Sequence, residues 1–234
     1  LTRRGLAAAS GLTMAIASLA ACSPSSSSHG LAVVATTTQI CDYVTQIAAR
    51  STDISLDKTD ASGQSAHVGA APEGAALTMS LTCLLAPNAS AHEHEMTPAQ
   101  TKALSEADVM AVSGVDLEHF LDDAVASSGF KGRMVVTSGV LTAADIDNPG
   151  TPDPEVAYTI DRGGERVNVA PWPFPPEEAG EEPEFRFDPH VWTSPKGAHV
   201  QVANLGAGLA AAVPDAASSI NAATASYLED IDAL

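Results

Sequence analysis

Four short apolar segments alternate with helical patterns along this chain, and that order limits the possible folds more than any other feature. It predicts an α/β fold in which a parallel four-stranded sheet is flanked by helices. The predicted strands are residues 31–36, 77–85, 108–113 and 133–137. In such sheets, ligands bind beyond the carboxyl ends of the strands. Functional residues are therefore expected in the loops that follow the strands.

Capping residues predict where several helices begin. Thr97-Pro98-Ala99-Gln100 combines an N-cap, a proline at the first helical position and a glutamine three residues after the cap. Ser194-Pro195 repeats the cap-plus-proline start. Asp116 is expected to open a helix that ends at Gly129, and residues 214–234 are expected to begin a long final helix.

Two stretches lack a regular pattern. Residues 51–76 are polar and rich in small side chains, and they are predicted to be a mobile insertion. Residues 145–187 are rich in proline and glutamate and predict a long surface excursion. A hairpin of residues 156–160 and 166–169 is expected within it. Apart from these insertions, residues 31–213 are expected to form one lobe.

The first 22 residues have the features of an export signal. Arg3 and Arg4 precede an apolar run of small residues that ends in Leu19-Ala20-Ala21-Cys22. This run is shorter than the ~20 residues that a membrane-spanning helix needs. Cys22 resembles the acylated cysteine of bacterial lipoproteins, and residues 23–30 would then be a flexible tether. An ordinary signal peptide is the alternative. We expect an extracytoplasmic lipoprotein on the outer face of the cell membrane.

The net charge bears on which partners the protein can bind, and the cysteines bear on whether it contains a disulfide. The formal net charge is −18, which argues against nucleic acid as a partner. With Cys22 assigned to the lipid, Cys41 and Cys83 form an even pair in an oxidising compartment. They follow the first and second predicted strands, which neighbour each other in many parallel sheets, so a disulfide is expected. Two buried thiols are the alternative.

Two of the seven histidines lie where the predicted architecture collects ligands. His92 follows the second predicted strand, and His190 precedes the helix capped by Ser194. Imidazole is the commonest metal ligand, and two imidazoles with carboxylates suit zinc or a similar divalent ion. His119 and His199 fall within predicted helices and are interpreted as packing or surface residues.

The sequence around these two histidines resembles the zinc- and manganese-binding solute-binding proteins of ABC importers. Residues 84–98 are similar to the first metal loop of that family, and Phe187-Asp188-Pro189-His190-Val191-Trp192 is similar to the second. Ala91 stands where the family has proline, and His94 stands where it has an aromatic residue. The resemblance covers residues 31–234 in order, apart from the two insertions.

The resemblance implies a two-lobed protein with the metal held between the lobes. His92 and His190 would be the ligands from the N-terminal lobe, and the remaining ligands would come from the C-terminal lobe. His94 would be an alternate ligand, while Glu95 and Asp188 would orient the imidazoles. Because residues 214–234 match the start of the inter-lobe helix, the C-terminal lobe is expected to be missing.

The implied function is capture of Zn²⁺ or Mn²⁺ as cargo, rather than as a catalytic cofactor, and delivery to an ABC permease. A monomer that is not an enzyme is expected. Zinc and manganese stay open, because the discriminating ligand would lie in the other lobe. Two other functions stay open: a surface adhesin of the same fold, and a secreted zinc hydrolase with Glu93 or Glu95 as base.

Overall fold

The computed structural model describes Leu1, residues 30–176 and residues 180–234. The predicted export signal, the lipidated Cys22 and nearly all of the predicted tether therefore lie outside the described residues. In the described part of the chain, no helix combines the length and the apolar character needed to cross a membrane.

A seven-stranded sheet lies at the centre of the fold, in the order β3-β2-β4-β1-β5-β6-β7. The strands are β1 (Leu31–Ala35), β2 (Ile54–Thr59), β3 (Ser65–Gly69), β4 (Leu77–Cys83), β5 (Val109–Val112), β6 (Arg133–Val136) and β7 (Thr159–Asp161). Only β2 and β3 pair antiparallel; every other neighbouring pair is parallel. The predicted parallel four-stranded sheet is therefore wrong. Its four strands exist as the central β4-β1-β5-β6, but the sheet is mixed and extends at both edges.

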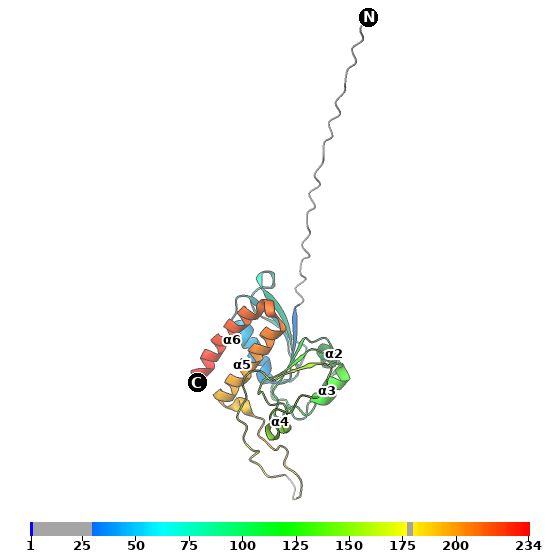
Figure 1. Ribbon diagram of the computed structural model, residues 1–234, viewed down its shortest axis with the longest axis vertical. Helices are drawn as coiled ribbons and strands as arrows, with labels where there is room; N and C mark the ends of the chain where they lie inside the picture. The colour runs from blue at the N-terminus through cyan, green and yellow to red at the C-terminus, as the bar shows by residue number, and fades with distance from the viewer. Residues whose placement is uncertain (2–29, 177–179) are drawn as a thin grey trace.

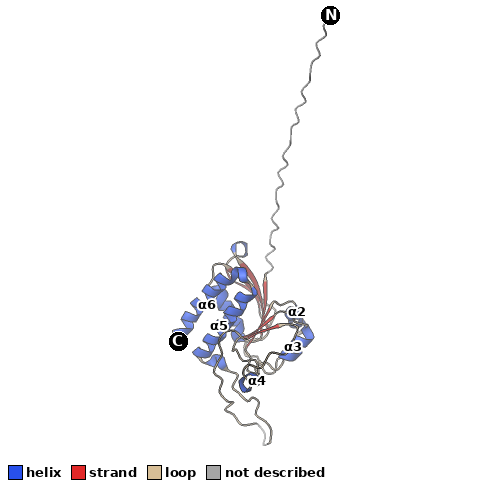
Figure 2. Cartoon of the chain, in the orientation of Figure 1, coloured by secondary structure: helices blue, strands red, loops and turns tan. Residues whose placement is uncertain are grey.

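Helices cover both faces of the sheet (Figures 1 and 2). The helices are α1 (Thr38–Ala49), α2 (Pro98–Ser105), α3 (Leu121–Ser128), α4 (Ala143–Asp147), α5 (Pro195–Ala212) and α6 (Ala217–Asp232). Short 3₁₀ turns occur at Pro72–Gly74, Val191–Thr193 and Pro214–Ala216. Val33 packs into one core with residues of α1, α5 and α6, whereas the adjacent Val34 packs with residues of α2 and α3. This follows from the strand geometry, since successive side chains point to opposite faces.

Residues 51–76 are not a mobile insertion: they supply β2 and β3. Ile54 and Leu56 are fully buried and face the core beneath α1, and the backbone of β2 pairs along its whole length with β4. The remaining side chains of β2 are polar because this hairpin forms an edge of the sheet. Backbone pairing with a strand more than twenty residues away leaves no local sequence pattern, so the prediction missed it.

Two further predictions are corrected in the loops. The expected hairpin within residues 145–187 does not form, because β7 pairs parallel with β6 and the Val167 N–H donates to the Ser138 carbonyl. The helix expected at Asp116 begins instead at Leu121. Asp116 has a positive φ of 56°, and its carboxylate accepts a hydrogen bond of 2.7 Å from the first N–H of α4, that of Ala143.

A disulfide joins Cys41, in the first turn of α1, to Cys83, the last residue of β4, across a Cα distance of 5.6 Å. The pairing follows from the sheet order. Because β1 and β4 are parallel neighbours, Ala35 lies opposite Cys83, and α1 begins three residues after Ala35. The disulfide therefore ties the exit of β1 to the exit of β4.

Candidate metal centre

The loop between β4 and α2 carries His92 to the carboxyl edge of the sheet. The predicted cap forms at the end of this loop: the Thr97 hydroxyl accepts from Gln100 N–H, and the Gln100 side chain accepts from Thr97 N–H. The Gln100 amide also donates to the carbonyl of Leu84 at 2.7 Å, which closes the loop at its base. His92 is half-buried, and its Nδ1 is a buried atom with no partner among the described residues.

The environment of His92 favours the neutral form of its imidazole. Burial lowers the pKa of His92, and the neighbouring His190 and His119 act in the same direction. The charge of Glu184 and the backbone of Leu117 oppose them without reversing the shift. A neutral imidazole is the form that binds a metal.

His190 lies beside His92, with ring centroids 5.6 Å apart. One carboxylate oxygen of Asp188 accepts two hydrogen bonds, from His190 Nδ1 at 2.8 Å and from the His190 backbone at 3.0 Å. With the carboxylate ionised, Nδ1 carries the proton, which leaves Nε2 as the free electron-pair donor. Such a carboxylate–histidine pair is typical of metal sites because it holds the ring and its tautomer.

Aromatic rings from the 145–187 excursion surround both histidines. Phe185 is buried with its centroid 4.9 Å from His92, and Trp172 is stacked on His190 at 5.8 Å. A short antiparallel contact places them there, since Trp172 N–H donates to the Arg186 carbonyl and Asp188 N–H donates to that of Ala170. Sequence reasoning missed both aromatic residues, because the proline-rich excursion has no periodicity that would mark an inward-facing side.

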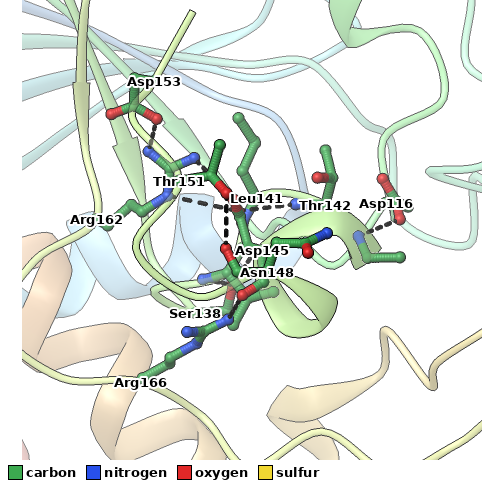
Figure 3. Close-up of polar contacts among 12 residues, drawn as sticks. Asp116, Ser138, Leu141, Thr142, Asp145, Asn148, Thr151, Asp153, Arg162 and Arg166 are labelled. Carbon is green, nitrogen blue, oxygen red and sulfur yellow. Dashed lines mark hydrogen bonds and ion pairs between the residues drawn. The ribbon is translucent and has the colours of Figure 1, made fainter.

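The excursion is anchored at its base by arginine–carboxylate contacts, drawn in Figure 3. Asp145 accepts from the backbone of Leu141 at 2.7 Å and of Thr142 at 3.2 Å, and it also pairs with Arg162. Arg162 reaches Asp153 as well, and Arg166 donates to the Asp145 carbonyl. Burial acts to raise the pKa of Asp145, but these donors outweigh it and the pKa lies below its usual value.

The structure does not bring the other predicted residues to the two histidines. The His94 ring packs edge-on against Phe120, with centroids 4.9 Å apart, and it makes no ring contact with His92 or His190. Burial lowers the pKa of His94, with the Gln100 side chain opposing. Glu95 is exposed and makes no hydrogen bond or ion pair within the described ranges. Among the predicted orienting residues, only Asp188 contacts an imidazole.

A third histidine does approach the site. His119 lies in the turn between β5 and α3, with its ring centroid 5.9 Å from that of His92 and 5.3 Å from that of Phe185. The sequence does not identify His119 as a site residue, because the following helix is predicted to begin at Asp116. His119 is therefore interpreted as a packing or surface residue of that helix, whereas α3 begins at Leu121. Recognising that His119 follows the carboxyl end of a central strand, as His92 does, would have found it.

A buried carboxylate fixes the turn that carries His119. Glu118 accepts hydrogen bonds from the Thr36 hydroxyl at 2.6 Å and from the backbone of Ser113 at 2.7 Å and Gly114 at 3.1 Å. Burial raises the pKa of Glu118, while these donors act against that rise. The carboxylate thereby joins the exits of β1 and β5, so the loop position of His119 is set by a buried, multiply bonded neighbour.

The arrangement provides two neighbouring imidazoles, one of them oriented by a carboxylate, on an aromatic-lined edge. Considering only residues that the structure describes, no three His, Cys, Asp or Glu side chains are close enough together to hold an ion as they stand. The site thus has the donors for a borderline divalent metal but presents them as an open pair.

The chain is thus an α/β protein that carries a candidate metal-binding pair at the carboxyl edge of its sheet. Residues 74–234 match the family described as the zinc-uptake complex component A, periplasmic. That match spans most of the chain, and the protein belongs to this family.

Solved structures show the same fold. Zn(II)-bound AdcA from Streptococcus pneumoniae aligns with a TM-score of 0.53 at 16% identity, over 87% of this chain and 31% of that one. The Zn(II)-bound ZnuA-like domain of the same protein aligns with a TM-score of 0.51 at 16% identity, over 87% of this chain and 52% of that domain. This chain therefore spans about half of the ZnuA-like domain that it resembles.

Proposed function

We propose that this chain is the N-terminal lobe of an extracytoplasmic solute-binding protein that captures Zn²⁺ or Mn²⁺ through His92 and His190 and delivers it to an ABC permease. The observation that carries the proposal is the pair of imidazoles 5.6 Å apart, contributed by loops about a hundred residues apart in sequence. Family membership supports it, since the family is that of a zinc-uptake component.

Several finer statements belong to the same proposal. Residues 31–213 form the lobe, and α6 is the start of a helix that leads to a second lobe with the remaining ligands. Cys22 carries the lipid that anchors a monomer to the outer face of the membrane. The metal is cargo and the protein performs no catalysis, because a carrier must release what it binds.

Titration calorimetry with Zn²⁺ and with Mn²⁺ tests this function. In the purified protein, a His92→Ala/His190→Ala double variant should lose at least about 100-fold in affinity, since affinity depends on ligand number. The matched control is His67→Ala/His199→Ala, which removes two histidines that pair with Asp57 and Asp232 away from the site. Asp188→Asn should weaken binding by about 10–100-fold through loss of the orienting carboxylate. Unchanged affinity in the His92/His190 variant would refute the assignment.

A further inference from the structure

A third imidazole, that of His119, lies with His92 against the buried ring of Phe185. The His92 centroid lies 4.9 Å and the His119 centroid 5.3 Å from that of Phe185, and the two histidine centroids are 5.9 Å apart. The His190 centroid lies 5.6 Å from that of His92. His92 therefore neighbours both of the other histidines, and the three come from three separate loops.

These centroid distances are close to those between imidazoles that bind the same metal ion. Because a zinc–nitrogen bond is about 2.0–2.1 Å long, two imidazoles bound to one tetrahedral zinc have ring centroids roughly 5 Å apart. His119 and His190 each lie within about 1 Å of that separation from His92. The three side chains do not yet converge on one point, so at least one must turn to complete a site.

His119 is the side chain that can turn. It is exposed, and it makes no side-chain hydrogen bond to any residue within the described ranges. Its backbone, by contrast, is held by the adjacent Glu118, whose carboxylate is buried and bonded to two strand exits. A fixed backbone with a free ring can swing an imidazole toward His92 at little cost, since rotamers of exposed side chains interconvert readily.

We propose that His119 is a third metal-binding side chain of this lobe, and that with His92 and His190 it forms a three-imidazole site that selects zinc. This inference rests on the proposed function and deepens it. Three imidazoles with an open fourth position are a set that zinc accepts in tetrahedral geometry. Manganese prefers carboxylate, carbonyl and water oxygens, which this set lacks.

The test is competition of Zn²⁺ and Mn²⁺ for the purified protein and its His119→Ala variant, with His199→Ala as the matched control. His199 is also partly exposed, but it pairs with Asp232 at 2.6 Å and makes no ring contact with the three histidines among the described residues. We expect His119→Ala to weaken zinc binding at least about 10-fold, because even the outer partners of metal ligands contribute about 10–100-fold. Manganese binding should change less, so the preference for zinc should fall.

X-ray absorption at the zinc edge provides a second readout, because it counts imidazoles directly. Three in the parent protein and two in His119→Ala would support the proposal. Zinc affinity within about twofold of the parent, or an unchanged imidazole count, would overturn it. If His92→Ala/His190→Ala abolishes binding while His119→Ala does not change it, only the third ligand is wrong. If neither variant changes binding, the proposed function fails as well.

Discussion

The two insertions, residues 51–76 and 145–187, are held to the same sheet in different ways. The first adds β2 and β3 to one edge, where backbone hydrogen bonds run along the strands and Ile54 and Leu56 enter the core. The second contributes only the three-residue β7 to the other edge, and the rest of it is attached by arginine–carboxylate pairs and by aromatic packing on the histidines.

This difference suggests that the first insertion mainly stabilises the fold, whereas the second mainly shapes the site. An edge hairpin with a buried apolar row adds stability that is insensitive to charge, since it derives from apolar area removed from water. The excursion instead brings Phe185 and Trp172 to the imidazoles and has little core of its own. Its position depends on Arg162 and Asp145, so the part of the molecule that shapes the site should also be the part that opens most easily.

The largest expected effect comes from truncating the hairpin's core anchor. Leu56 is fully buried between Met79 and Val68 of the neighbouring strands. Leu56→Ala should lower the free energy of unfolding by about 2–5 kcal/mol, through lost apolar burial and the cavity left behind. Urea unfolding measures it. Val68→Ala, on the half-buried β3 position, is the control and should cost less. A loss below about 1 kcal/mol would mean that the hairpin is not anchored by core packing.

Breaking the polar anchor of the excursion should have a smaller and more local effect. Arg162→Ala removes the donors to Asp145 and Asp153, and hydrogen bonds to charged groups contribute about 1.5–3 kcal/mol. Hydrogen exchange should accelerate at Thr159 and Val167, whose N–H groups bond to Gly132 and Ser138, but not in β2. Arg186→Ala is the control, because the Arg186–Asp147 pair is solvent-exposed and screened, so its loss should change exchange little. If hydrogen exchange in β2 accelerated equally in Arg162→Ala, the excursion and the β2–β3 hairpin would not be independently anchored.

The two regions should also respond to pH with opposite signs, and this is the smallest effect. The pKa of Asp145 is lowered, so its contribution is complete above the unfolded value of about 3.9 and is lost as the pH falls through the lower folded value. The pKa of His67 on β3 is raised, chiefly by its hydrogen bond to Asp57. Its contribution is complete below about pH 6.5 and is lost as the pH rises through the raised value.

Hydrogen exchange as a function of pH, corrected for intrinsic rates, measures both effects. Acid should loosen the excursion first, and Asp145→Asn should remove that dependence. Mild alkali should loosen the β2–β3 hairpin slightly, and His67→Ala should remove it. The same sign of response in both regions would show that these two groups do not govern the local stability.

Local sequence patterns were enough to predict the central strands, the caps of α2 and α5, and the loops that hold His92 and His190. Each depends on neighbouring residues: an apolar run makes a buried strand, and a Thr or Ser hydroxyl three residues from an N–H makes a cap. The same patterns placed Cys41 and Cys83 at adjacent strand exits, where the structure joins them.

Only the tertiary structure decided the edges of the sheet and the surroundings of the histidines. β2, β3 and β7 are strands because a partner backbone lies beside them, and hydrogen bonding to a distant strand has no local sequence period. Phe185, Trp172 and His119 reach His92 and His190 from segments without regular pattern, through loops whose course is set by buried Glu118 and by Asp145. Such contacts depend on chain closure in three dimensions, which neighbouring residues do not encode.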